Sequence, residues 1–199
     1  MVKTRIAVLV SGGGTNLQAL LDAQAAGKLP HGEIVLVVSN KEGAYALTRA
    51  ENFGVEGLVI TGKDFEAKLQ AALEARGIQM IVLAGFLKIL SANFTSKWPE
   101  RILNIHPSLI PSFCGEGYYG LRVHEEALKY GVKVTGATVH FVNEVPDGGR
   151  IIAQKAVDIL PGDTPEILQR RVMEQAEWKL LPMAAEQVSK EIVKQKKER

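Results

Sequence analysis

The feature that most constrains this chain is an alternation between short apolar runs and stretches with helical periodicity. Runs such as "RIAVLVS", "EIVLVVS", "GLVI" and "MIVLAG" are rich in β-branched residues, as expected of parallel strands covered on both faces. Helical patterns separate them at 16–26, 44–53 and 64–76. This order predicts an α/β fold: an open, doubly wound, Rossmann-like sheet, mostly parallel, with helices on both faces.

The second half of the chain extends the same pattern. "RILNI" predicts a further strand, followed by a proline-rich loop, a helix at 121–130 and strands near 135–142 and 151–157. A final helix is expected to begin near "GDTPE", with Thr164 as its N-cap and Pro165 at its first position. No linker-like tract or repeat divides the 199 residues. One domain spanning 1–199 is therefore expected.

Composition narrows the classes of protein that fit. The chain is 46% hydrophobic and 23% charged, and no apolar run is long enough to span a bilayer or to form a targeting signal. Of 24 basic and 22 acidic residues, five and two lie in the last ten positions, leaving 19 basic against 20 acidic. This near-neutral body argues against a nucleic-acid partner. Cys114 is the single cysteine, which suits a reducing, cytoplasmic location.

A glycine-rich loop, "LVSGGGTNLQ", follows the first predicted strand and opens the first helix. Three glycines allow a tight turn whose amides approach a ligand, and a helix N-terminus favours an anion, so the loop predicts a phosphate site. We expect Thr15 and Gln18 to form a capping box. The loop is not a Walker A motif, and Leu17 replaces the third glycine of a dinucleotide fingerprint. A tight turn without a ligand is the alternative.

A polar cluster is expected at the end of the strand in "LNIHPSLIPSF". Asn104 and His106 are two residues apart and share one face of a strand, and Pro107 then ends the ladder. An amide and an imidazole at the carboxyl edge of a strand can stabilise an oxyanion and move a proton, as acyl transfer requires. A structural, hydrogen-bonded histidine is the alternative interpretation.

Asp147 favours the catalytic interpretation of this cluster. It lies in "NEVPDGGRII", a loop rich in proline and glycine where an acid also forms turns. If the loop folds over the strand ends, the carboxylate can orient His106 and stabilise its imidazolium. His140 is expected to be a packed structural residue, and no acid cluster with the spacing of a metal site is present in the sequence.

Six segments together resemble one known family. They are "VSGGGTNLQALLDA", "VVSNKEGAYALTRAENFGV", "IVLAGFLKILS", "LNIHPSLIPSF", "VTGATVHFVNEVPDGG" and "DTPEILQRRVMEQAEWKLLP". The resemblance is to the phosphoribosylglycinamide formyltransferases, the folate-dependent enzymes of purine synthesis, and it runs from the first strand to the last helix. The "NIHPSLIP" segment is shared with other 10-formyltetrahydrofolate enzymes, whereas "SGGGTN" narrows the choice.

The resemblance implies a reaction, a co-substrate and roles for particular residues. The formyl group of 10-formyltetrahydrofolate would pass to the amine of 5-phosphoribosylglycinamide by direct attack and an oxyanion intermediate, without a metal. The N-terminal half would bind the ribonucleotide, and the C-terminal half the folate. The implied catalytic residues are Asn104, His106 and Asp147. The implied ribonucleotide site is Gly13, Gly14, Thr15, Asn16 and Glu177. The implied folate site is Leu87, Lys88, Ile89, Leu90, Asn104, Asn143, Val145 and Asp147.

The chain departs from the family pattern in several places. The helix before Glu177 is one residue longer than in some relatives, and Trp178 stands where many members have His. The loop around Cys114 and Tyr118 is longer than the shortest versions. A folate-contacting arginine of some members has no match, and Lys63 is a loose substitute. The sequence leaves a homodimer open.

Three rival functions make different demands on the chain. A formyltetrahydrofolate deformylase shares the Asn/His/Asp set but carries an extra N-terminal domain, whereas this sequence starts at the first strand. A methionyl-tRNA formyltransferase adds a C-terminal RNA-binding domain, for which the residues after the last strand are too few. A non-catalytic nucleotide-binding domain would need the missing third glycine and ribose acid.

Overall fold

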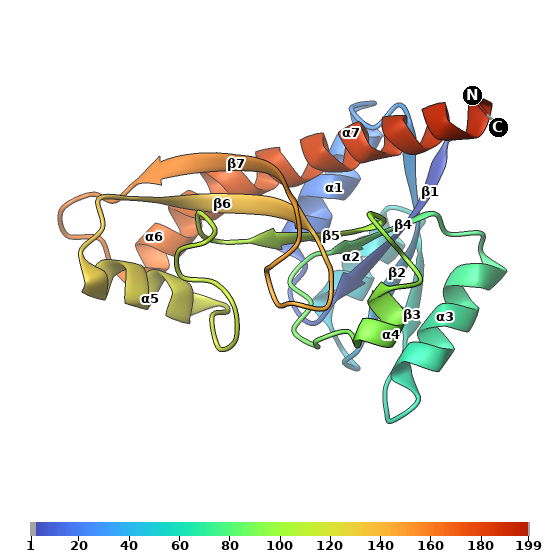
Figure 1. Ribbon diagram of the computed structural model, residues 1–199, viewed down its shortest axis with the longest axis horizontal. Helices are drawn as coiled ribbons and strands as arrows, with labels where there is room; N and C mark the ends of the chain where they lie inside the picture. Colours follow the sequence, from blue (N-terminus) through green and yellow to red (C-terminus); the bar gives the residue numbers. More distant parts are fainter. Residues whose placement is uncertain (1–2, 199) are drawn as a thin grey trace.

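The computed structural model describes residues 3–198 and contains one seven-stranded sheet in the order β3-β2-β1-β4-β5-β6-β7. β1 to β5 pair in parallel, and β6 and β7 are antiparallel to their neighbours. The predicted mostly parallel α/β sheet is confirmed (Figure 1). The strands are β1 (Thr4–Val10), β2 (Gly32–Ser39), β3 (Glu56–Val59), β4 (Met80–Leu83), β5 (Ile102–His106), β6 (Val134–Phe141) and β7 (Ile151–Asp158).

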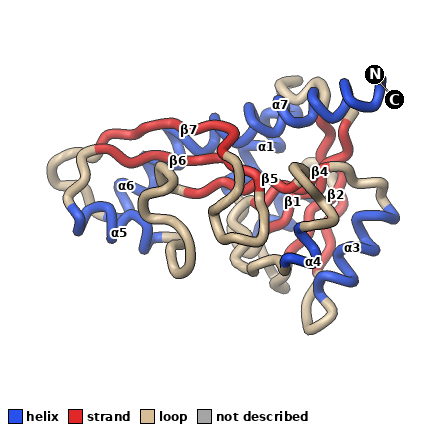
Figure 2. Tube along the Cα trace, viewed as in Figure 1, coloured by secondary structure: helices blue, strands red, loops and turns tan. Residues whose placement is uncertain are grey.

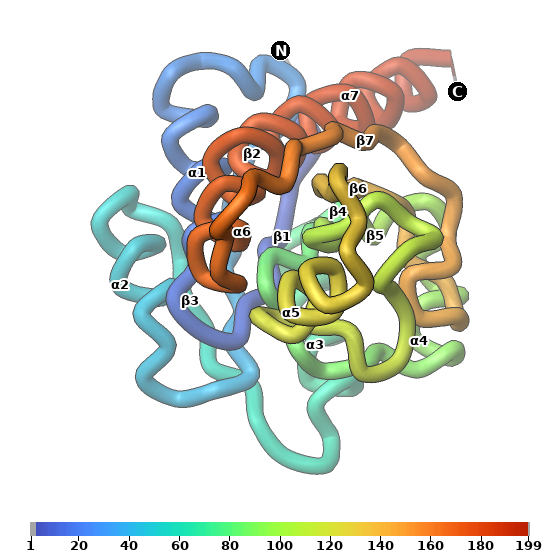
Figure 3. The backbone as a smooth tube through the Cα atoms, turned by 90° about the vertical axis from the view of Figure 1, so that its left-hand side faces the viewer, coloured from blue at the N-terminus to red at the C-terminus, as the bar shows by residue number. Residues whose placement is uncertain are grey.

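Helices cover both faces of the sheet, as the sequence predicts (Figure 2). Buried residues of α1, α2, α6 and α7 pack on one face, and those of α3 and α4 on the other. Figure 3 shows α1, α2 and α6 on the same side of the molecule. The helices are α1 (Thr15–Ala25), α2 (Tyr45–Asn52), α3 (Phe65–Ala75), α4 (Ala92–Thr95), α5 (Leu121–Tyr130), α6 (Pro165–Val172) and α7 (Trp178–Lys197).

Alternation along β1 explains why the strand has apolar residues on both sides. Ile6 and Val8 point into the core beneath α1 and α7, whereas Ala7 and Leu9 point into the core beneath α3. Because successive side chains of a strand face opposite sides, a strand between two helical layers needs a continuous apolar run. The β-branched pattern of the sequence therefore arises from this packing.

The predicted final helix is divided by a π-helical turn, η1 (Met173–Glu177), between α6 and α7. The start is as predicted: the Thr164 side chain accepts a hydrogen bond from the Ile167 amide, and Pro165 is the first helical residue. A π turn holds one more residue than an α turn and occurs mainly as a single bulge at functional sites. The extra residue seen before Glu177 in the sequence coincides with this turn.

The predicted capping box at the start of α1 is wrong. Gly14 is the N-cap, with a left-handed backbone (φ 73°), and Thr15 is already the first helical residue. The Gln18 side chain donates to Asp22 and accepts from Arg49, so it does not reach back to the cap. The tight turn at Gly14 displaces the helix start by one residue from the position that the pattern requires.

Gly14 also lies at the closest approach of α1 and α2. A Cβ atom added there would lie 2.6 Å from the Ala46 Cβ, whereas one added at Gly13 would meet no atom within 4 Å. We expect Gly14→Ala to lower the free energy of unfolding by about 2–3 kcal/mol, because a left-handed backbone and a clash both oppose the methyl group. Urea denaturation measures the change.

Gly13→Ala is the matched control for this prediction. It adds the same methyl group one residue away, in open space and without a left-handed backbone. Its free energy of unfolding should stay within about 0.5 kcal/mol of the wild type. Equal losses in the two variants would show that the contact with Ala46 does not limit the position.

Candidate active site

The ends of three neighbouring strands form the candidate active site. β4 lies between β1 and β5 in the sheet, and all three run in the same direction. The glycine loop follows β1, the segment 84–91 follows β4, and β5 ends at His106. Strands in a sheet are spaced by about 4.8 Å, so the ends of β1 and β5 are about 10 Å apart. Ligands of open α/β sheets bind at this edge.

The glycine loop has its carbonyl groups turned toward α2. The Ala46 amide donates to the Gly12 carbonyl (3.1 Å), and Arg49 Nε donates to the Gly13 carbonyl (2.8 Å). The first amides of a helix have no acceptor within it. With the carbonyls held by α2, the amides around Thr15 are the polar groups that the loop offers to a ligand. This arrangement suits an anion.

Glu177 lies against the same helix end, as expected from its grouping with Asn16. Asn16 Nδ2 donates to Glu177 Oε2 at 2.6 Å, and both side chains are buried. Burial raises the pKa of Glu177 to about 7, and the hydrogen bond from Asn16 only partly opposes this shift. Asn16 Oδ1 is buried without a partner among residues 3–198. The pair therefore presents an unsatisfied polar atom beside the glycine loop.

His106 is held in one tautomer by the loop that follows β5. Its Nε2 lies 2.9 Å from the Phe113 carbonyl and must donate to it, so a neutral ring has its lone pair on Nδ1. Nδ1 lies 3.5 Å from Asp147 Oδ2. Burial lowers the pKa of His106 more strongly than the charge of Asp147 raises it. Protonation of Nδ1 turns a repulsive contact with the carboxylate into an ion pair.

Asp147 reaches this histidine from the loop between β6 and β7, which folds back toward β5 (Figure 1). The Gly115 amide donates to Asp147 Oδ2 at 2.9 Å, and His140 Nε2 lies 3.4 Å from Oδ1. Burial raises the pKa of Asp147. The contacts with His140 and His106 and the hydrogen bond from the Gly115 amide outweigh burial, so the pKa lies below its usual value. The carboxylate is therefore ionised at neutral pH.

Asn104 is oriented by His140 from the neighbouring antiparallel strand. The two residues are direct partners in the register of β5 and β6. His140 Nδ1 donates to the Phe141 carbonyl (2.8 Å), so Nε2 of the neutral ring accepts from Asn104 Nδ2 (3.1 Å). The second amide hydrogen points toward Asp147 Oδ1 at 3.4 Å. That contact is long for an N–H donor, and this hydrogen is the one that a substrate oxygen can take.

The segment after β4 is tied to the glycine loop by a buried serine. Ser11 Oγ accepts from the Leu87 amide (2.9 Å) and donates to Asn40 Oδ1 (2.7 Å). Leu87 and Ile89 are exposed, the latter by 70%, and Leu90 is buried. Lys88 Nζ lies 4.5 Å from the centre of the Phe65 ring. The predicted folate segment thus offers apolar side chains and a cation at the sheet edge.

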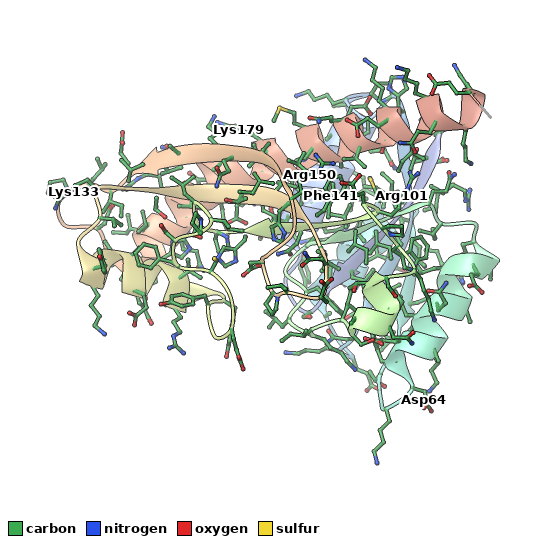
Figure 4. All side chains as sticks on the ribbon, viewed as in Figure 1. Asp64, Arg101, Lys133, Phe141, Arg150 and Lys179 are labelled. Atoms are coloured by element: carbon green, nitrogen blue, oxygen red, sulfur yellow. The ribbon has the colours of Figure 1, made fainter. Side chains whose placement is uncertain are left out.

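The loop between β6 and β7 supplies the remaining predicted folate residues. Asn143 Oδ1 accepts from the Val145 amide (3.0 Å), and Val145 is 54% exposed. Arg150 covers the Phe141 ring, with Cζ 4.7 Å from its centre, and Figure 4 labels the two side by side. The loop is therefore fixed at both ends, while an apolar side chain remains accessible between them.

The sequence predicts neither a metal site nor a membrane span. Within residues 3–198, no group of three or more His, Cys, Asp and Glu side chains could hold a metal ion. No helix of that part of the chain is long and apolar enough to cross a membrane.

Lys63 lines a cavity of about 620 Å³ together with Lys88, between α3 and α4. The loose match at Lys63 is therefore near the predicted folate segment.

Sequence reasoning missed several residues that contact the predicted ones. His140, which it assigned to packing, orients Asn104; Ser11 holds Leu87; and the Phe113 carbonyl sets the tautomer of His106. His140 was detectable in principle from a register pairing it with Asn104. A backbone carbonyl leaves no signal in a side-chain pattern. Cys114 Sγ contacts the Pro111 carbonyl, and burial raises the pKa of its thiol.

Comparison with known proteins gives one consistent result. The family described as formyl transferase matches residues 4–185. A phosphoribosylglycinamide formyltransferase of Haemophilus influenzae is 42% identical over 185 residues, which is 90% of this chain and 84% of the relative. A trifunctional purine biosynthetic protein, adenosine-3, of Drosophila melanogaster is 45% identical over 183 residues, but the chain spans only 13% of its length.

A solved structure agrees with these sequence matches. The glycinamide ribonucleotide transformylase 1 of Symbiobacterium toebii is similar, with a TM-score of 0.87 and 41% identity. The match covers 94% of this chain and 88% of that one. The family match over most of the chain, the relative from Haemophilus influenzae and the common fold all point the same way, and the chain belongs to the formyl transferase family.

Proposed function

We propose that this protein transfers the formyl group of 10-formyltetrahydrofolate to the amine of 5-phosphoribosylglycinamide, in de novo purine biosynthesis. The products are the N-formyl ribonucleotide and tetrahydrofolate. One observation carries the proposal: a phosphate-type loop and the Asn104, His106 and Asp147 cluster occur at one sheet edge, with β4 between them. The distance of about 10 Å between the ends of β1 and β5 suits a ligand with a phosphate at one end and an amine at the other.

The reaction needs donors and a proton route, and the cluster supplies both. The amine lone pair forms a bond to the formyl carbon, and the carbonyl oxygen becomes an oxyanion. Collapse of this intermediate breaks the bond to N10 of the folate, which takes up a proton as the amine loses one. The amide hydrogen of Asn104 that has only the long contact with Asp147, and a protonated His106, are the donors for the oxyanion. Positioned donors suffice for this chemistry, and no side-chain nucleophile is required.

Asp147 is proposed to keep His106 ready for proton transfer. Its ionised carboxylate faces Nδ1, while the Phe113 carbonyl occupies Nε2. Nδ1 is therefore the ring atom that exchanges a proton, directly or through water. Burial lowers the pKa of His106 below its usual value, and the negative charge of Asp147 partly offsets this shift and stabilises the imidazolium when the ring takes up a proton.

The remaining assignments follow the same division of the site. We assign Gly13, Gly14 and Thr15 to the phosphate and Glu177 with Asn16 to the ribose. Exposed Leu87, Ile89 and Val145, with Lys88, Leu90 and Asn143, are assigned to the folate. A cytoplasmic location, a homodimer and the absence of nucleic-acid and membrane partners stay predictions. Formate release to water, the reaction of a deformylase, is the second candidate because it would use the same Asn104, His106 and Asp147.

The fate of the formyl group separates these candidates. Purified protein is incubated with 10-formyltetrahydrofolate labelled in the formyl carbon, with and without 5-phosphoribosylglycinamide. We expect label to appear in the ribonucleotide and tetrahydrofolate to form only when the ribonucleotide is present. Formate released at the same rate without the ribonucleotide would identify a hydrolase instead.

Asp147→Asn tests the proposed catalytic pair. Asn also adopts the left-handed backbone of this position (φ 54°), so the loop should keep its course. We expect kcat to fall by about a hundredfold, a typical loss for proton-transfer catalysis, while KM for the ribonucleotide changes little. Loss of the carboxylate also lowers the pKa of His106, so the limb of the pH-rate profile that reports this histidine moves to lower pH.

The control removes an equal charge from the same loop. Glu144 is exposed, and Glu144→Gln should leave both kcat and the pH profile unchanged. The catalytic assignment of Asp147 would be wrong if the Asp147→Asn variant kept its turnover, or if its only defect were a higher KM for the ribonucleotide.

Glu177→Gln tests the protonation state of the buried acid. Its pKa rises from 4.5 to about 7 on folding, so the folded chain holds a proton that the unfolded chain releases. The free energy of unfolding of the wild type should therefore fall by about 3 kcal/mol, from this group alone, between pH 4.5 and pH 7. The Gln variant should lack this fall when urea denaturation is compared at pH 5 and pH 8.

Exposed Glu174 on the same turn provides the control. Glu174→Gln should keep the wild-type pH dependence, because its carboxyl group is not buried with Asn16. A Glu177→Gln variant whose stability declined with pH as steeply as the wild type would show that the buried acid is already ionised at low pH.

A further inference from the structure

Arg49 on α2 lies over the glycine loop, outside the motif that predicts a phosphate site. Its Nε donates to the Gly13 carbonyl (2.8 Å), and its Nη1 donates to Gln18 Oε1 (2.8 Å). Its Cδ would lie 3.5 Å from a Cβ placed on Gly14. These contacts fix the guanidinium group beside the loop and the first turn of α1. Figure 3 shows α1 and α2 on the same side of the molecule.

The guanidinium group retains both charge and donors. A guanidinium has five N–H donors, and two are used by Gly13 and Gln18. Across residues 3–198, no carboxylate forms an ion pair with Arg49, whereas Arg76, Arg150 and Arg171 pair with Glu56, Glu100 and Asp163. Its other contact is the Tyr45 ring, whose centre lies 5.0 Å from Cζ. The charge is therefore not neutralised locally.

A cavity also connects Arg49 with Thr15, the first residue of α1. It lines a cavity of about 790 Å³ together with Thr15 and Gln18. Two acids, Asp22 and Glu186, line that cavity as well; Asp22 accepts from Gln18 (2.9 Å) and Glu186 pairs with His31 (2.5 Å). Neither acid forms an ion pair with Arg49 within the described residues, so its charge is available to a ligand in the cavity.

We propose that Arg49 binds the phosphate of the substrate and selects for phosphorylated over unphosphorylated substrates. The proposal rests on the proposed function. The backbone amides of the loop provide hydrogen bonds without a net charge, and Arg49 adds the cation that a phosphate dianion requires. Arginine suits this role because its planar fork donates to two phosphate oxygens at once. The bonds to Gly13 and Gln18 orient the fork before the substrate binds.

Three variants test the role of Arg49. Arg49→Gln removes the charge, Arg49→Lys keeps it without the fork, and Lys28→Gln removes an equal charge from another side chain lining the same cavity. KM and kcat are measured for the ribonucleotide and for 10-formyltetrahydrofolate, together with inhibition by inorganic phosphate and the urea midpoint.

For Arg49→Gln, we expect KM for the ribonucleotide to rise by about tenfold or more, the effect of losing a charged hydrogen bond. Inhibition by inorganic phosphate should weaken by a similar factor, while kcat, KM for the folate and the urea midpoint stay unchanged. Arg49→Lys should recover part of the affinity, and Lys28→Gln should behave as the wild type.

Two outcomes would overturn the inference. A higher KM for the ribonucleotide with unchanged phosphate inhibition would place Arg49 away from the phosphate. Loss of kcat, of both affinities and of stability together would show that Arg49 only supports the loop. Failure of the proposed function is distinguishable, because the wild type would then not formylate the ribonucleotide. Direct titration of wild type and Arg49→Gln with inorganic phosphate would still test Arg49.

Discussion

The order of three strands, β1-β4-β5, is the constraint on which the rest of the candidate site depends. β4 separates the two ends that carry the glycine loop and His106, and its own loop lies between them. Ser11 joins the glycine loop to the loops after β4 and β2, because its hydroxyl contacts both the Leu87 amide and Asn40. The spacing of the proposed phosphate and formyl-transfer sites is thus set by the sheet. The loops at this edge supply the side chains, but they do not determine the distance between the two sites.

β6 and β7, the two antiparallel strands beside β5, bring two further residues to the site: Asp147 from their connecting loop and His140 from β6. β6 ends beside the start of β5, and the loop between β6 and β7 then folds back and brings Asp147 to His106. The register of the same pair of strands places His140 opposite Asn104. A carboxylate and two orienting contacts therefore come from a segment far along the chain, and they form without any further domain.

The helices and strands, and the shared face of Asn104 and His106, could be predicted because each leaves a local signal. Buried parallel strands require continuous apolar runs, and the two-residue period places Asn104 and His106 on one face. The approach of Asp147, by contrast, depends on how a hairpin folds, and the sequence only allowed it. Arg49 sits in an ordinary helix, and its importance depends on the packing of α2 against the glycine loop. The capping box failed because Gly14 adopts a left-handed turn that no cap pattern describes.

The family resemblance points to Glu177, but the sequence does not predict the environment of its side chain. The family resemblance assigns Glu177 to the ribonucleotide site, and in the structure its side chain, at the end of the π turn, contacts Asn16. Its environment was not predictable, since burial emerges only when α7 packs against α1. A π turn holds one more residue than an α turn and therefore changes the face on which the following side chains lie, which is how the turn at Met173–Glu177 affects the direction of Glu177.

The two buried acids of the site differ in charge because they differ in donors. Asp147 lies near His106, His140 and the Gly115 amide, and these hold its pKa below the usual value despite burial. Glu177 has one neutral amide as its donor, and burial raises its pKa to about 7. Near neutral pH, the ionised carboxylate of Asp147 therefore places a negative charge beside the proposed reacting amine. At the start of α1, the raised pKa of Glu177 reduces its negative charge near neutral pH, which favours binding of the substrate phosphate by the helix N-terminus and Arg49.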